Sequence, residues 1–236
     1  MTHIKAKLGA ILVCFLIISL LGCETRFEDN TRILVNGVIK DQSDLAVQDA
    51  QINVYTRRVT SFLGGESEFL LGSNFSDSDG EFSVISLFDK DEDFSIEIDA
   101  GETYSKYVYR TNTVDFTPTD FTFNLETVTL QKLSKVNYSV TRTSGDGNSI
   151  QYTFRFINGF CSEVYEQGAL NPEESQCNTL QFLNGSLNDN NPDREGSFDA
   201  PIGTQVEFTY SINEAPETTE IFTINDNSVN EFTFTY

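Results

Sequence analysis

Strict alternation of apolar and polar residues recurs along most of the chain. It is clearest at 94–98, 121–125, 150–156, 206–212 and 232–236. Successive side chains of a strand point to opposite faces of its sheet, so this pattern predicts half-buried strands of antiparallel sheets. Abundant Thr, Phe, Tyr and Val favour strands as well, and no window shows a capped apolar stripe of helical period. We therefore predict an all-β fold whose 20 phenylalanines form the core.

Turn-forming residues separate these alternating stretches. Examples are Asp79-Gly80, Ala100-Gly101, Asn158-Gly159 and Asn184-Gly185, which are typical of connections between short strands. Roughly 205 residues are long for one small sandwich and comfortable for two. We predict tandem antiparallel β-sandwich domains at 33–133 and 135–236, with a polar loop at 184–195 in the second.

The N-terminal segment has a different pattern. Lys5 and Lys7 precede an apolar run from Leu8 to Gly22, and a basic start followed by a short apolar segment is typical of a secretory signal peptide. The run is shorter than the roughly 20 residues that a spanning helix needs. We therefore interpret 1–22 as a cleaved export signal.

The end of this segment, Leu20-Leu21-Gly22-Cys23, resembles the lipobox of bacterial lipoproteins. The resemblance implies that Cys23 becomes the first residue of the mature chain and carries a diacylglycerol, with acyl chains such as palmitate. Residues 23–32 are then the lipidated cysteine and a polar tether. The alternative is an ordinary signal peptide with an incidental cysteine.

Charge and composition narrow the function. The formal net charge is −21, and it becomes −23 without residues 1–22 because these contain two lysines and no acid. Such an acidic chain argues against nucleic acid as a partner. The single histidine is His3, in the signal, which removes histidine-based catalysis and the usual zinc sites. Tryptophan is absent, which disfavours a sugar-binding face without removing it.

Two cysteines remain after Cys14 leaves with the signal and Cys23 takes the lipid. In an exported chain Cys161 and Cys177 most simply form one disulfide. The alternative is a pair of free thiols, although the pair lacks the spacing of a redox motif.

Residues 33–88 contain a recognisable series of short motifs. They are Ile33-Leu-Val-Asn-Gly37-Val-Ile-Lys-Asp41, then Leu45-Ala-Val-Gln-Asp-Ala50-Gln-Ile-Asn-Val54, then Ser76-Asp-Ser-Asp79-Gly80-Glu-Phe82. This series resembles the carboxypeptidase regulatory-like domain, a transthyretin-like sandwich. The resemblance implies a non-catalytic domain of the kind found in outer-membrane receptors and surface lipoproteins. The residues after 135 resemble no family.

Three acidic segments are candidate calcium loops: 77–81, 89–93 and 189–193. Calcium needs several oxygen ligands on a tight loop. However, Asp79-Gly80 is already explained by a turn, and the other two segments lack a glycine and a final carboxylate at the expected positions. We assign no metal site and no cofactor.

We expect a non-enzymatic lipoprotein, anchored through Cys23, that assists a protein partner in the outer membrane. A glycan- or peptide-binding surface lipoprotein is the alternative. A hydrolase using paired carboxylates has less support, because nothing selects one pair among 36 acids. The ligand, and whether the protein faces the periplasm or the exterior, stay open.

Overall fold

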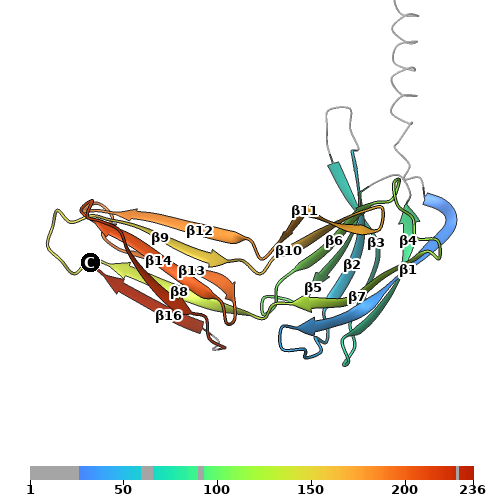
Figure 1. The fold of residues 1–236 in the computed structure, drawn as a ribbon, viewed down its shortest axis with the longest axis horizontal. Helices are drawn as coiled ribbons and strands as arrows, with labels where there is room; N and C mark the ends of the chain where they lie inside the picture. The colour runs from blue at the N-terminus through green and yellow to red at the C-terminus, as the bar shows by residue number, and fades with distance from the viewer. Residues whose placement is uncertain (1–26, 60–65, 90–92, 227–228) are drawn as a thin grey trace, which may run out of the picture.

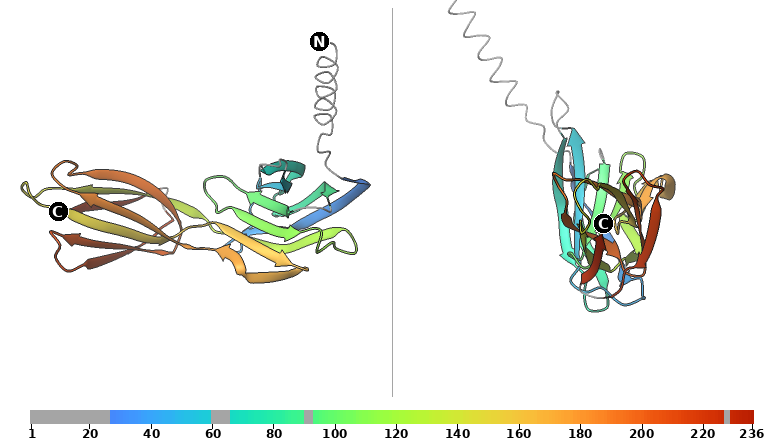
Figure 2. Two further views of the ribbon diagram at one scale, coloured as in Figure 1. Left: turned by 90° about the horizontal axis from the view of Figure 1, so that it is seen from above. Right: turned by 90° about the vertical axis from the view of Figure 1, so that its left-hand side faces the viewer.

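The computed structural model describes residues 27–59, 66–89, 93–226 and 229–236, and every regular element in them is a strand. The strands form two sandwiches that lie end to end (Figures 1 and 2). The prediction of an all-β fold with two tandem sandwiches is confirmed. The signal segment 1–22, Cys23 and the rest of 23–26 lie outside the described residues. Strand β1 begins at Phe27, inside the predicted tether.

In the first sandwich, a small sheet packs against a larger one. The small sheet has the order β4-β1-β7, with strands Glu81–Asp89, Phe27–Asp41 and Thr122–Leu130. The larger has the order β11-β10-β6-β5-β2-β3, with strands Ala169–Cys177, Cys161–Glu166, Tyr107–Asn112, Asp93–Asp99, Gln51–Val59 and Glu66–Phe75.

The second sandwich is built in the same way. One sheet has the order β12-β9-β14-β15, with strands Leu180–Leu187, Ile150–Ile157, Gln205–Ile212 and Thr218–Thr223. The other has the order β13-β8-β16, with strands Arg194–Pro201, Leu133–Thr141 and Val229–Thr235. Among otherwise antiparallel pairs, β1 with β7, β10 with β6, and β16 with β8 are parallel.

The alternation seen in the sequence becomes two separate hydrophobic cores. In β5, Phe94, Ile96 and Ile98 are buried between the sheets. The second core is mainly aromatic: Phe154 has no exposed surface and packs against Tyr138, Phe208 and other rings. The prediction that the phenylalanines form the core has exceptions, since Phe75 and Phe182 are more than half exposed.

Two sequence predictions fail at glycines. Asn184 and Gly185 lie inside β12 rather than in a turn, and the predicted loop 184–195 contains the end of β12 and the start of β13. The physical reason is that the Tyr152 ring lies where a Cβ of Gly185 would be, so the glycine lets a large ring pack flat on the neighbouring strand. By contrast, Gly80 has a φ of 77° and ends the predicted tight turn.

The hairpin β10–β11 departs from the predicted domain order. Residues 161–177 lie between β9 and β12 in sequence, within the predicted second domain, yet β10 pairs with β6 of the first sandwich (Figure 1). The physical reason is that β6 would otherwise be an open edge of its sheet, and open edges pair readily. The predicted disulfide is confirmed, because Cys161 and Cys177 are bonded as directly opposed residues of this hairpin.

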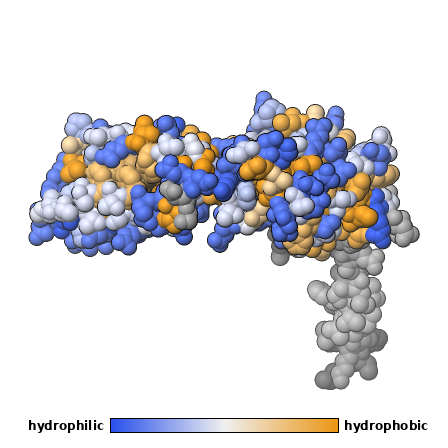
Figure 3. Space-filling view, turned by 90° about the horizontal axis from the view of Figure 1, so that it is seen from below, coloured by the Kyte–Doolittle hydropathy of each residue, from blue (hydrophilic) through white to orange (hydrophobic). Residues whose placement is uncertain are grey.

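The chain crosses between the sandwiches after β7, after β9 and after β11. Backbone hydrogen bonds tie these crossings together. The N–H of Ser105 donates to the carbonyl of Gln131 at 2.7 Å, that of Leu133 to Thr103 at 2.8 Å, and that of Asn158 to Thr179 at 3.0 Å. Hydrogen-bonded crossings restrict bending far more than a single linker does. Figure 3 shows the narrow waist that they form between the two bodies.

We predict that removing the disulfide destabilises the hairpin first. Closing a loop of about this length contributes roughly 3 kcal/mol in the chain-entropy model. A Cys161→Ala/Cys177→Ala chain should unfold at lower denaturant than wild type, and hydrogen exchange should rise most in β10 and β11. Reductant should lower the wild-type midpoint and leave that of the variant unchanged. Equal midpoints without reductant would show that strand pairing alone holds the hairpin.

Candidate functional site

A cavity of about 570 Å³ lies on the outer face of the larger sheet of the first sandwich. Strands β2, β5, β6, β10 and β11 line it, together with residues that follow β6 and β10. Strand β6 leaves the junction at Tyr107 and ends at Asn112, so a cavity lined by Arg110, Asn112 and Asp115 lies at the end away from the second sandwich.

Strand alternation explains which side chains form its floor. Phe94 and Ile96 point into the core, so Ser95 between them points to the outer face. Arg110 is directly opposite Ser95 on β6, and Val164 of β10 is beside Arg110. The floor is thus a row of a hydroxyl, a guanidinium and an aliphatic side chain across three strands.

Ser95 is the most unusual member of this row. Its side chain is only 5% exposed, and its Oγ has no hydrogen-bond partner among the described residues. Buried hydroxyl groups nearly always have a partner. Within the described part of the chain, no general base is hydrogen-bonded to this hydroxyl, as one would be in an activated serine nucleophile.

Ion pairs border the floor on the β2 side. Arg57 contacts Glu68 at 2.7 Å and Glu97 at 3.9 Å, which carries its side chain across the outer face. Lys106 contacts Glu97 at 2.7 Å, and this hydrogen bond raises the pKa of Lys106. Arg110, in contrast, forms no ion pair within the described part of the chain. The cavity is also lined by the carboxylates of Asp93, Asp115, Glu166 and Glu174.

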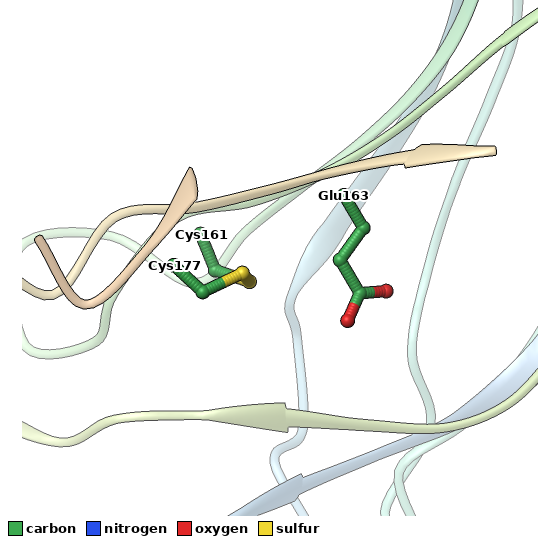
Figure 4. Close-up of side chains that lie close together, drawn as sticks. All are labelled: Cys161, Glu163 and Cys177. Carbon is green, nitrogen blue, oxygen red and sulfur yellow. A yellow bond between two sulfur atoms is a disulfide. The ribbon is translucent and has the colours of Figure 1, made fainter. Parts of the chain in front are cut away.

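A second polar cluster lies on the inner face of the same sheet, around Glu163, which Figure 4 shows near the Cys161–Cys177 disulfide. The Glu163 carboxylate accepts hydrogen bonds from the Tyr107 hydroxyl at 2.5 Å and the Tyr165 hydroxyl at 3.1 Å. Burial, reinforced by Glu163, raises the pKa of Tyr165 to about 12 and that of Tyr107 further. Cys161, Glu163 and Cys177 form a group of metal-ligand type, but the two sulfurs are bonded to each other, so neither is a thiolate ligand.

The acidic segments considered for calcium have internal partners where the structure describes them. Asp77 Oδ1 accepts hydrogen bonds from the N–H groups of Asp79 and Glu81 at 2.9 and 3.0 Å. Asp189 pairs with Arg142, and Asp193 accepts the Arg142 N–H at 2.9 Å. The carboxylates of both segments therefore stabilise their loops through these internal contacts. Residues 90–92 of the segment 89–93 lie outside the described residues.

The outer face of the β12-β9-β14-β15 sheet carries a shallower cavity of about 460 Å³. Its lining is mostly hydroxyl and amide groups, including Thr153, Asn184 and Thr209. Thr153 donates to Asn184 at 2.8 Å, and Thr209 is hydrogen-bonded to Thr219 at 2.8 Å. These groups satisfy one another, so this face shows no unpaired group comparable to Ser95.

The predicted site residues thus have different outcomes. Cys23 lies outside the described residues, and Cys161 and Cys177 form the predicted disulfide, which is typical of proteins outside the cytoplasm. Ser95, Arg110 and Glu163 were not predicted. Each is a polar residue in an alternating strand, which is the same signal as any solvent-facing position.

Within residues 27–59, 66–89, 93–226 and 229–236, the structure has no helix of the length and apolarity needed to cross a bilayer.

Comparison with known proteins adds little to this picture. No known protein family and no curated protein matches the chain. Among solved structures, it is similar to the TIE protein of Bacillus anthracis at 14% identity and a TM-score of 0.31, over 88% of this chain and 34% of that one. For a streptococcal ancillary pilin the values are 12%, 0.32, 88% and 63%. For the shaft pilin SpaA from Lactobacillus rhamnosus GG they are 8%, 0.29, 87% and 98%.

The chain spans about a third of the length of the first of these proteins and less than two thirds of the second. TM-scores near 0.3 are too low for these similarities to carry an argument about function.

The tyrosine cluster predicts an alkaline loss of stability. Below pH 10 the Tyr165 phenol is protonated in both states, so its contribution is fully present. Between pH 10 and about 12 the unfolded chain loses this proton while the folded chain keeps it, so the free energy of unfolding falls. Denaturant titrations across this range should show a shallower decline for Tyr165→Phe than for wild type.

Tyrosinate absorbance offers a direct check, because the chain has no tryptophan to obscure it. Glu163→Gln should move part of the phenol titration to lower pH. A wild-type chain whose nine tyrosines all titrated near pH 10 would contradict the described cluster.

Proposed function

We propose that this protein is a lipid-anchored, non-catalytic binding module of the outer membrane, which holds its second sandwich away from the membrane for contact with a protein partner. The observation that supports it most directly is the position of Phe27. Strand β1 begins there, at the end of the first sandwich away from the second (Figure 1). Only three residues, 24–26, lie between Cys23 and Phe27, so the distance from Cys23 to Phe27 is at most about 14 Å.

The junction supports a presenting role. Its hydrogen-bonded crossings and the disulfide at the base of β10 restrain the angle between the sandwiches. A module anchored at one end and stiff along its length keeps its far end at a defined distance from the membrane. A flexible linker would lose this positioning to conformational entropy.

A row of exposed residues on the second sandwich supports contact with a protein. Phe182, Arg155, Glu207 and Ile221 are successive cross-strand neighbours on the outer face of β12, β9, β14 and β15. Phe182 is 59% and Ile221 58% exposed, and they flank the Arg155–Glu207 ion pair of 2.7 Å. Exposed apolar side chains around a fixed polar pair are common in protein interfaces.

The non-catalytic reading rests on residue types. After His3 the chain has no histidine, and the Ser95 hydroxyl is hydrogen-bonded to no base among the described residues. Binding of a small ligand is the second candidate function, and the cavity at Ser95 and Arg110 favours it over a glycan site elsewhere on the described surface.

Anchoring is tested by Cys23→Ala in the full chain expressed in a bacterial host. Wild type should fractionate with membranes and incorporate labelled palmitate, because the acyl chains bury many methylenes at about 0.8 kcal/mol each. Cys23→Ala should show neither property. Cys14→Ala, which changes the cysteine inside the predicted signal, is the matched control and should behave as wild type. A Cys23→Ala chain that stayed in the membrane fraction would overturn the anchor, and protease treatment of intact cells would report which side it faces.

Partner contact is tested by Phe182→Ser/Ile221→Ser. Crosslinking in intact cells should recover an outer-membrane protein with wild type and several-fold less with this variant, since truncating interface anchors costs about 1 kcal/mol or more each. Phe75→Ser, equally exposed on the first sandwich, should leave recovery unchanged. Equal recovery by all three chains would remove this face as the contact.

A further inference from the structure

We propose that the cavity on the outer face of β5, β6 and β10 binds a short peptide with free termini. Its terminal carboxylate contacts Ser95 Oγ and the Arg110 guanidinium, and its ammonium lies among the carboxylates that line the same cavity. This site goes beyond the anchoring role and does not depend on it.

Ser95 is the observation that points to a ligand. Its hydroxyl is held on the outer face by strand alternation, is nine-tenths buried, lines the cavity, and has no partner among the described residues. A buried hydroxyl without a partner carries an uncompensated desolvation cost. A ligand oxygen in the cavity would accept a hydrogen bond from the Ser95 hydroxyl and remove that desolvation cost.

Arg110 supplies the complementary charge. It is the cross-strand neighbour of Ser95, its side chain is exposed, and it forms no ion pair within the described part of the chain. This is notable because the chain has more than twice as many acids as bases and several acids line the same cavity. A guanidinium and a hydroxyl side by side suit the two oxygens of a carboxylate.

The charged residues around the cavity indicate that the ligand carries a cationic group as well as a carboxylate. Two arginines and four carboxylates line it, namely Arg57, Arg110, Asp93, Asp115, Glu166 and Glu174. A simple anion or an acidic glycan would be repelled by this excess and by the acidic chain as a whole. A ligand that carries a cationic group with its carboxylate pairs with both kinds of side chain.

The strand repeat sets the separation of the two charges. Asp93 is two residues before Ser95 on β5, and Glu166 is two residues after Val164 on β10. Two residues of a strand span about 6.6 Å. A dipeptide has comparable spacing between its termini, because its two Cα atoms are about 3.8 Å apart and each terminus lies beyond them. Val164, beside Arg110, offers apolar surface for a small side chain.

The test uses the full chain, expressed with its signal and purified in detergent, so that neither a membrane nor a partner is needed. Dialanine is the probe, titrated calorimetrically. Dialanine amide lacks the carboxylate, N-acetyl-dialanine lacks the ammonium, and glucuronate carries a carboxylate on a sugar. Wild type should bind dialanine and bind each of the other three at least about tenfold more weakly, as expected for loss of one charge-assisted contact.

Ser95→Ala and Arg110→Gln should each weaken dialanine binding by about tenfold. Arg32→Gln is the matched control, since Arg32 is exposed on β1 in the opposite sheet. Ser95→Ala removes a buried, unpaired hydroxyl and its desolvation cost, so its thermal unfolding midpoint should equal or exceed that of wild type. Weaker dialanine binding by this variant would therefore be a binding defect and not a folding defect.

Other results would overturn the proposal. No heat of binding with wild type at millimolar dialanine, or equal binding by Ser95→Ala and Arg110→Gln, would show that the cavity is not this site. Glucuronate binding as tight as dialanine would assign the cavity to sugar acids instead of peptides. Loss of membrane anchoring in Cys23→Ala with dialanine binding intact would leave this site standing.

Discussion

The parallel pairing of β10 with β6 is the interaction on which the rest of the molecule depends. It carries a hairpin from the second half of the chain onto the sheet of the first. Without it the sandwiches would be joined by the single connection between β7 and β8. With it the described chain crosses the junction again after β9 and after β11, and the disulfide closes the hairpin beside the crossing. A parallel pair has no tight turn of its own, so this contact exists only because both sandwiches fold around it.

The same pairing creates the polar features of the first sandwich. Strand β10 brings Glu163 and Tyr165 beside Tyr107 on the inner face, where burial and the carboxylate keep the phenols protonated. It brings Val164 beside Arg110 on the outer face, where the cavity forms. One strand therefore supplies a tyrosine–glutamate cluster on one side and a wall of the candidate binding site on the other.

The acidic residues are distributed differently from the apolar residues that form the two cores. The acids of this chain lie largely on loops and outer faces, where exposed ion pairs contribute little to stability. Several hold local structure, as Asp77 holds its turn and Asp189 and Asp193 hold Arg142. Among the described residues, Asn36 and Ser95 each have a buried side-chain oxygen without a hydrogen-bond partner. Ser95 differs from Asn36 because it lies opposite Arg110, which forms no ion pair in the described chain.

Local patterns in the sequence were enough to predict the all-β class, the alternating strands around Ile96, Phe154 and Phe208, the turn at Gly80 and the pairing of Cys161 with Cys177. These follow from local rules: the period of a strand, the torsion angle of a glycine, and the chemistry of thiols in an exported chain. The anchor at Cys23 stays a prediction from the lipobox. Three features became visible in the folded chain alone: residues 161–177 join the first sandwich, Gly185 lies under Tyr152 within a strand, and Ser95 is buried beside Arg110. Strand β11 has mostly exposed side chains, so no hydrophobic pattern marks it, and the neighbour of an edge strand is chosen by contacts between residues about 50 positions apart. Pairing between strands so far apart leaves no local pattern in the sequence. The candidate site could not be predicted because it lies across strands that such pairing brings together.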